Sequence, residues 1–121
     1  MKVLLVDDSL SQRYRMKEII VSNGIAVEEV DEATNGLEAY DKVKKRSYKL
    51  IFLDWNMPKM DGISFLKKID SEGYDIPVIM VTSEGEIEYA RKAMKFGAYG
   101  YITKPVDVKK VEIILNRYVN K

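Results

Sequence analysis

Five short apolar runs divide the chain into segments of helical length. The runs lie near residues 2–6, 26–30, 49–53, 76–81 and 99–103. Strand-sized runs that alternate with helix-sized segments predict a parallel sheet covered by helices, which is the α/β class. We therefore expect a (βα)5 doubly wound sheet of five parallel strands.

The polarity of each run predicts its place in the sheet. The first, third and fourth runs are apolar almost throughout, as expected for central strands that are covered on both faces. The second and fifth runs contain polar or small residues, which suits the edges of a sheet. The expected strand order is therefore 2-1-3-4-5.

Local signals mark the ends of the helices. Asn35-Gly36 predicts a turn, Ser83 and Glu86 have the spacing of a capping box, and Asp61 and Asp107 predict helix starts. The apolar spacing over 108–119 predicts a last helix. Because no linker or repeat interrupts this pattern, we expect a single domain over residues 1–121.

Composition narrows the classes of function. The 20 basic and 19 acidic residues give a net charge of +1, so neither nucleic acid nor a membrane surface is an expected partner. The basic run at 42–46 lies at an expected helix end, where cations are favourable. The chain has no cysteine for disulfides and no histidine for catalysis. Its first residues turn acidic too soon for a signal peptide, so we expect a cytoplasmic protein.

Chemically active side chains directly follow four of the apolar runs. Asp7 and Asp8 follow the first run, Asp54 the third, Thr82 ends the fourth, and Lys104 follows the fifth. The carboxyl ends of parallel strands meet in one crevice, where open α/β sheets bind their ligands. The sequence therefore predicts one acidic pocket that contains all of these groups.

An acidic pocket of this kind requires positive charge. Carboxylates about 4 Å apart repel by roughly 4 kcal/mol per pair at an effective dielectric near 20, so three would not stay ionised together without a cation. Because only oxygen ligands are available, Mg²⁺ is favoured over Zn²⁺ or copper. Lys104 adds a fixed positive charge. A carboxylate that faces both charges is suited to attack phosphorus, and Thr82 could donate a hydrogen bond to the phosphoryl group.

The ordered set Asp7-Asp8, Asp54, Thr82 and Lys104-Pro105 resembles the receiver domain of bacterial two-component response regulators over the whole chain. The segment 54–62, which reads DWNMPKMDG, is especially similar to the single-domain chemotaxis regulators of that family. The resemblance implies a flavodoxin-like fold. It also implies a signalling switch, not an enzyme with an external substrate, that takes a phosphoryl group from a histidine kinase or phosphotransfer protein.

The resemblance implies roles for the residues of the metal and phosphoryl site. Asp54 would be the phosphoacceptor, Asp8 a direct Mg²⁺ ligand and Asp7 an outer-shell partner that holds Mg²⁺ waters. Asn56 would offer its backbone carbonyl to the metal. Lys104 would pair with Asp54 or with a phosphoryl oxygen.

The resemblance also implies how the switch works. Thr82 would be the switch hydroxyl, and the ring of Tyr101 would change rotamer when Thr82 moves. Asn56 and Glu84 would influence how fast the phosphoryl group is lost, and both match the chemotaxis regulators, so we predict a short-lived phosphoryl state. The Lys104-Pro105 bond would be cis.

Apolar residues beyond one core stripe indicate an output surface around the fourth helix, fifth strand and fifth helix. Between Glu86 and Gly97 they span about half of the helical circle, more than the roughly 100° that a core stripe needs. A single broad core face is the alternative interpretation. We hypothesise that a protein partner binds a surface formed by Ile87, Ala90, Met94, Tyr101, Lys110, Ile113 and Arg117.

Two other classes of protein share parts of this pattern. An aspartate-nucleophile phosphatase of the haloacid dehalogenase type also uses Mg²⁺, but it needs a second Asp where Asn56 stands. A flavodoxin-like cofactor binder needs a loop rich in glycine and hydroxyl groups after the first strand, and residues 7–12 contain no glycine.

Within the receiver class, we expect a monomeric, stand-alone regulator of chemotaxis or motility, with the flagellar motor switch as one possible target. A phosphorelay shuttle and a receiver cut from a larger regulator remain the alternatives.

Overall fold

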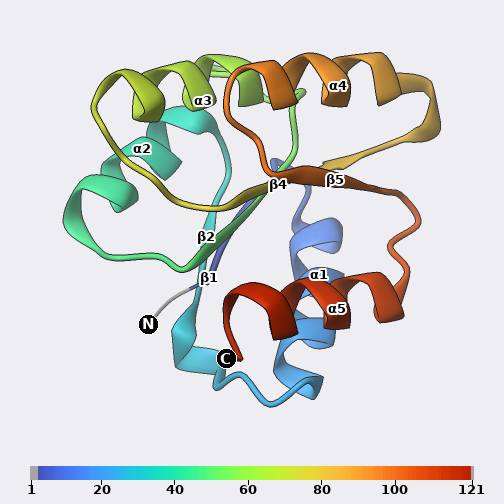
Figure 1. The fold of residues 1–121 in the computed structure, drawn as a ribbon. Coiled ribbons are helices and arrows are strands. Elements are labelled where there is room, and N and C mark those ends of the chain that lie inside the picture. Colours follow the sequence, from blue (N-terminus) through green and yellow to red (C-terminus); the bar gives the residue numbers. More distant parts are fainter. Residues whose placement is uncertain (1–2, 121) are drawn as a thin grey trace.

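A parallel sheet of five strands forms the centre of the fold in the computed structural model, which describes residues 3–120 apart from the side chain of Glu84 (Figure 1). The strands run in the order β2-β1-β3-β4-β5, and every neighbouring pair is parallel. Both the α/β class and the predicted order are therefore confirmed. The strands are β1 (Val3–Val6), β2 (Val30–Ala33), β3 (Leu50–Leu53), β4 (Val78–Thr82) and β5 (Gly100–Thr103).

Helices cover both faces of the sheet. Figure 1 shows α1 and α5 on one face and α2, α3 and α4 on the other. Each face has its own apolar core, because alternate residues of a strand point to opposite sides: Leu4 and Val6 join one core, Val3 and Leu5 the other. The helices are α1 (Leu10–Ser22), α2 (Gly36–Lys45), α3 (Gly62–Ser71), α4 (Ile87–Lys95) and α5 (Val108–Tyr118), with short 3₁₀ helices η1 (Val27–Glu29) and η2 (Glu84–Glu86).

The predicted helix starts are confirmed. The side chain of Asn35 accepts a hydrogen bond at the start of α2, as Asp61 does for α3 and Asp107 for α5. Ser83 and Glu86 form a complete capping box at the start of η2. Each cap satisfies backbone N–H groups that have no partner within the helix.

The predicted second strand is wrong in its position. Residues 26–30 were expected to be extended, but 27–29 form η1, and the strand runs from Val30 to Ala33. Charged residues inside β2 hid it in the sequence. Asp31 pairs with Arg46 at 3.2 Å, and Glu32 pairs with two cations of α1, so the edge strand tolerates both carboxylates.

The predicted partner surface is wrong at one position. Ala90 is only 1% exposed, because it faces the core between α4 and the sheet. The exposed members include Met94, Tyr101 and Ile113, of which Ile113 is the most exposed at 59%. Lys110 and Arg117 are exposed, and Ile87 is half-buried.

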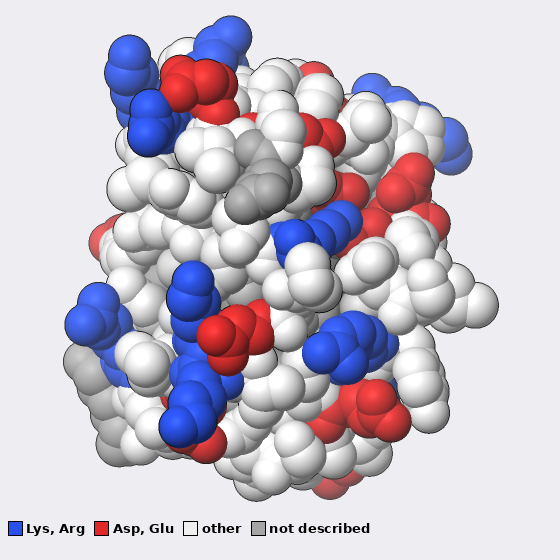
Figure 2. Space-filling model, turned by 90° about the vertical axis from the view of Figure 1, so that its right-hand side faces the viewer, with Lys and Arg blue, Asp and Glu red and all other residues white. Residues whose placement is uncertain are grey.

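Charge is distributed in small mixed groups over the surface. Figure 2 shows basic and acidic side chains interspersed on one face of the molecule, without a large field of one sign. This distribution agrees with the net charge of +1. Within residues 3–120, none of the helices has the length and apolar character that a membrane span requires.

Candidate functional site

Hydrogen bonds of the sheet continue past the strand ends and position the predicted site. The backbone N–H of Asp7 donates to the Ala33 carbonyl at 3.0 Å, and that of Asp54 donates to the Val6 carbonyl at 2.9 Å. The N–H of Lys104 donates to the carbonyl of Thr82 at 2.7 Å. The structure therefore fixes these residues at the same edge of the sheet, as the sequence predicted.

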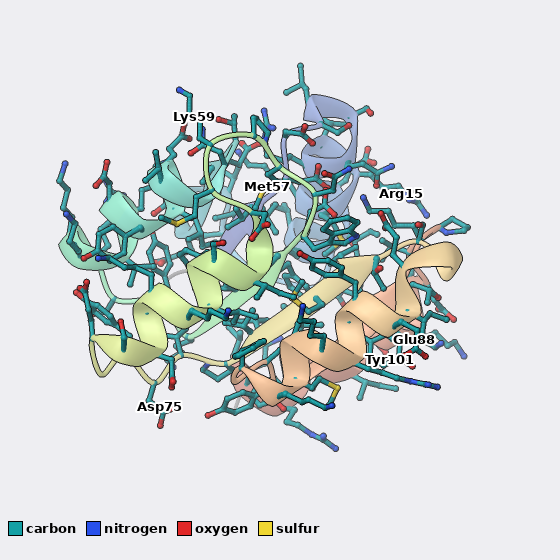
Figure 3. The ribbon with its side chains drawn as sticks, turned by 90° about the horizontal axis from the view of Figure 1, so that it is seen from above. Arg15, Met57, Lys59, Asp75, Glu88 and Tyr101 are labelled. Atoms are coloured by element: carbon teal, nitrogen blue, oxygen red, sulfur yellow. The ribbon has the colours of Figure 1, made fainter. Side chains whose placement is uncertain are left out.

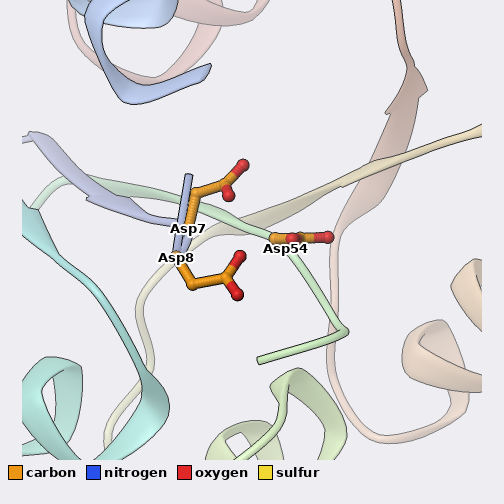
Figure 4. Close-up of side chains that lie close together, drawn as sticks. All are labelled: Asp7, Asp8 and Asp54. Atoms are coloured by element: carbon orange, nitrogen blue, oxygen red, sulfur yellow. The ribbon is translucent and has the colours of Figure 1, made fainter. Parts of the chain in front are cut away.

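Three carboxylates converge at this edge. Asp7, Asp8 and Asp54 each offer an oxygen, and these oxygens lie within 4.8 Å of one another (Figure 4). Asp7 and Asp54 are buried, whereas Asp8 is exposed. Oxygen donors at this spacing, in a chain without histidine or cysteine, fit a hard cation such as Mg²⁺.

One ammonium group faces the carboxylates. The Nζ atom of Lys104 lies 3.5 Å from Asp7 Oδ2 and 3.9 Å from Asp54 Oδ2. The peptide bond that follows Lys104 is cis, as the resemblance implied. Three carboxylates and one ammonium leave a net charge of −2, so the residues of the pocket favour a bound cation.

Burial raises the pKa of Asp54 to about 6, and the charge of Asp7 adds to this effect. The ammonium of Lys104 and the backbone N–H of Trp55 act in the opposite direction but do not cancel it. Without a cation, the carboxyl group of Asp54 therefore holds a proton more readily than a carboxyl group in water. A cation in the pocket would favour the ionised form.

A glycine lets α3 begin directly against the backbone of Asp54. The N–H of Gly62 donates to the Trp55 carbonyl at 2.8 Å, and a Cβ at Gly62 would lie 2.8 Å from the Asp54 carbonyl oxygen and from Trp55 Cα. Figure 3 labels Met57 and Lys59 in the loop that joins Asp54 to this helix. The close contact fixes the direction in which the loop leaves the pocket.

The switch residues lie where the resemblance placed them along the chain, but the hydrogen bonds described for the Thr82 hydroxyl go to groups other than Asp54. Its hydroxyl is 0% exposed and donates to Glu86 Oε1 at 3.4 Å or to the Ser83 carbonyl at 3.3 Å. Tyr101 lies on β5, paired with Met80 of β4, and its side chain is exposed.

Two further residues, Asn56 and Glu84, were predicted to influence phosphoryl loss. Asn56 is exposed in the loop after Asp54, and the side chain of Glu84 lies outside the described part of the chain.

Sequence reasoning missed Arg13. Its guanidinium donates to the Asp7 carbonyl oxygen at 2.6 Å and to Glu32 at 3.0 Å, so it ties the backbone of the acidic pocket to β2. The position of Arg13 in the first turns of α1 could have indicated a contact outside the helix, because a cation there interacts unfavourably with the helix dipole. The side chain instead folds back over the end of β1, where it meets negative charge.

Comparisons with known proteins agree with this geometry. A family model described as the response regulator receiver domain matches residues 3–116. The chemotaxis protein CheY1 of Helicobacter pylori is 38% identical over 95% of this chain and 97% of its own length.

Two solved structures share the fold closely. The receiver domain of NtrX from Brucella abortus has a TM-score of 0.88 at 28% identity, covering 99% of both chains. The chemotaxis protein CheY4 of Vibrio cholerae has a TM-score of 0.82 at 33% identity, covering 98% of both chains.

Neutralising Asp54 should stabilise the metal-free protein near neutral pH. The pKa of about 6 in the folded protein exceeds the ordinary value of 3.8, so the folded state binds the proton more tightly than the unfolded state. This contribution to stability is therefore lost as the pH rises through 6. In EDTA, Asp54→Asn should gain on the order of 2–3 kcal/mol at pH 7.5 and much less near pH 4.5. Urea denaturation at both pH values measures this difference.

The exposed Asp70, changed to Asn, controls for the general loss of a carboxylate. An equal effect of Asp54→Asn at both pH values would show that folding does not penalise the Asp54 charge.

Gly62→Ala should destabilise the fold by about 1–3 kcal/mol and weaken Mg²⁺ binding, because the new Cβ must displace the backbone of Asp54. Urea denaturation and Mg²⁺ titration of Trp55 fluorescence measure the two effects. Gly85→Ala is the matched control, since nothing lies within 4 Å of its added Cβ. Wild-type stability and affinity in Gly62→Ala would contradict this account of the loop.

Proposed function

Because this chain belongs to the response regulator receiver domain family, we propose that Asp54 accepts a phosphoryl group and thereby switches a protein-binding surface. The convergence of Asp7, Asp8 and Asp54 beside Lys104 is the observation that supports the proposal most directly. The chain is a CheY-like receiver, and receivers act as signalling switches. We further propose that residues 1–121 form a single receiver domain.

The proposed transfer joins Asp54 to the phosphorus atom of a donor. A carboxylate oxygen attacks phosphorus, the phosphorus–nitrogen bond of the donor breaks, and the departing imidazole keeps the electron pair and takes up a proton. Since this chain has no histidine, the donor is a histidine kinase or a phosphotransfer protein. The Trp55 N–H donates to Asp54 Oδ1 at 2.9 Å, which supports a fixed orientation of the attacking group.

Several groups would hold Mg²⁺ in this pocket: the carboxylates of Asp8 and Asp54 directly, Asp7 through water, and the backbone carbonyl of Asn56. Bound Mg²⁺ supplies positive charge against the phosphoryl oxygens. Lys104 supplies a second positive charge, since its ammonium group already faces Asp7 and Asp54.

The switch begins at Thr82 in this proposal. Its buried hydroxyl turns to donate to the new phosphoryl group, and Tyr101 on the neighbouring strand follows it. Asn56 and Glu84 border the site along the chain and influence the rate of phosphoryl loss. We expect the phosphorylated state to be short-lived.

The output surface proposed here is formed by α4, β5 and α5. Tyr101, Ile113 and Arg117 line one groove of about 150 Å³, which therefore combines aromatic, aliphatic and basic side chains. Met94, Ile87 and Lys110 extend the same surface. A protein target fits this chemistry, because the exposed apolar side chain of Ile113 lies beside the basic group of Arg117.

We propose that the pathway is chemotaxis or motility, which the names of the similar proteins from Helicobacter pylori and Vibrio cholerae support. The motor switch is the target that this pathway would supply. A receiver cut from a larger regulator is the second candidate, since a longer NtrX structure matches this chain over only 26% of its own length. A phosphorelay shuttle is the third. The proposal includes the cytoplasmic location and monomeric state expected from the sequence.

Phosphodonors should produce a response that depends on Asp54. Mg²⁺ should change the fluorescence of Trp55 in a saturable way, and acetyl phosphate or beryllofluoride should add a second change, because both events occur beside this residue. Asp54→Asn should lose the second change. An unchanged intact mass with acetyl phosphate, together with no fluorescence response, would contradict the proposed transfer.

Activation should also reach the output surface. Hydrogen exchange of the wild-type protein with Mg²⁺ and beryllofluoride should change at the amides of α4 and β5, because Thr82 ends the strand beside them. The amides of α2, which lies away from α4 and β5, serve as the internal reference. The surface is incorrectly assigned if only the loop after β3 responds.

A further inference from the structure

The switch hydroxyl is already engaged before any phosphoryl group arrives. Thr82 is 0% exposed, and a buried hydroxyl needs a hydrogen-bond partner. It finds Glu86 Oε1 at 3.4 Å and the Ser83 carbonyl at 3.3 Å. Both distances are long for a hydroxyl donor, so these contacts hold Thr82 weakly and can be broken at low cost.

Glu86 is fixed in place by other contacts. Oε1 of Glu86 accepts from the Ser83 hydroxyl at 2.7 Å and from the Ser83 N–H at 3.1 Å. Burial favours its neutral form, but the hydrogen bonds from Ser83 and the charge of Lys104 together lower the pKa of Glu86. The acceptor that faces Thr82 is therefore an ionised carboxylate that keeps its position when Thr82 leaves.

An aromatic stack joins the phosphoacceptor loop to α4. The rings of Trp55 and Tyr89 lie 3.8 Å apart with an angle of 24° between their planes. Trp55 is the residue directly after Asp54, and its backbone N–H donates to the Asp54 carboxylate. Its indole nitrogen is buried and has no hydrogen-bond partner among the described residues.

These contacts connect the loop after Asp54 to the segment 82–89, and the proposed switch requires these two segments to move relative to one another. We infer that Glu86 is a positioning residue that holds the Thr82 hydroxyl away from Asp54 in the unphosphorylated protein, while the Trp55–Tyr89 stack keeps α4 against the acceptor loop. Trp55, Thr82, Glu86 and Tyr89 together are called the clasp below. This inference rests on the proposed function of Asp54 as phosphoacceptor.

The clasp adds a free-energy cost to activation, because Thr82 must leave Glu86. When Thr82 turns toward a phosphoryl oxygen, Glu86 loses one weak donor but retains both bonds from Ser83. The cost is therefore limited to the Thr82 contact and to any adjustment of the stack. A variant without the Glu86 acceptor should pass to the active state more readily.

The test separates the acceptor atom from the charge. Glu86→Ala and Glu86→Gln both remove the negative charge, but Gln retains an oxygen that can accept from Thr82. With saturating Mg²⁺, Glu86→Ala should bind beryllofluoride roughly two- to tenfold more tightly than Glu86→Gln, the range of one net hydrogen bond. In a Thr82→Ala background the two variants should bind equally, because the hydroxyl is absent.

A matched control uses the same helix. Glu88→Ala removes an exposed carboxylate that pairs with Arg91 and should bind beryllofluoride like the wild type. Thermal unfolding of each Glu86 variant shows whether loss of the capping box has unfolded the protein. Equal binding by Glu86→Ala and Glu86→Gln in the protein that retains Thr82 would overturn the role of Glu86.

The stack is tested with a second pair of variants, which also keeps the inference testable if Glu86→Ala does not fold. Tyr89→Phe retains an aromatic ring, whereas Tyr89→Leu removes it. The near-ultraviolet circular dichroism of Trp55 should be retained in Tyr89→Phe and lost in Tyr89→Leu, and Tyr89→Leu should bind beryllofluoride more tightly than Tyr89→Phe. Equal affinity of the two variants would overturn the role of the stack.

Failure of the proposed function has a different signature. A wild-type protein that does not bind beryllofluoride with Mg²⁺, or that binds it as well after Asp54→Asn, would overturn the phosphoacceptor assignment and the clasp with it. Normal Asp54-dependent binding without the predicted differences among the variants would overturn the clasp alone.

Discussion

Unbalanced negative charge at the carboxyl edge of the sheet is the constraint on which the rest of the site depends. Oxygens of three carboxylates lie within 4.8 Å of one another, and the ammonium group of Lys104 faces two of them. Such a cluster costs folding energy unless a cation or a proton joins it. Burial, together with the charge of Asp7, raises the pKa of Asp54 to about 6, so both effects disfavour its ionised form. A site held in this state is prepared to take up a metal ion and then an anionic phosphoryl group.

The fold tolerates this charge because hydrogen bonds fix the backbone at the edge of the sheet. Ladder hydrogen bonds continue to Asp7 and Asp54 beyond the last residues of β1 and β3. Arg13 anchors the Asp7 carbonyl, and Gly62 lets α3 start against the Asp54 backbone. The backbones of Asp7 and Asp54 therefore cannot move apart without breaking the edge of the sheet. Rigid support of this kind keeps a reactive group in a productive position.

The same rigidity makes a switch possible. Thr82 ends β4, and the chain passes within a few residues into η2 and α4, so a movement of one hydroxyl at the pocket reaches a surface helix. Apolar packing of Ala90 and Ala93 holds α4 to the sheet, while Tyr89 and Trp55 hold it to the acceptor loop. A ligand shifts such an equilibrium only by its differential affinity for the two arrangements.

The sequence by itself determined the sheet, its order, the helix starts and the members of the acidic pocket. These follow from local rules: apolar runs, capping residues, and the meeting of parallel strand ends at one edge. It failed for β2, whose carboxylates depend on cations from α1 and on Arg46 just after α2, and for Ala90, whose burial depends on the rotation of α4. Only the tertiary structure decided that Glu86 engages Thr82 and that Trp55 stacks on Tyr89. Such contacts depend on side-chain directions across the fold, which no periodicity along the chain encodes.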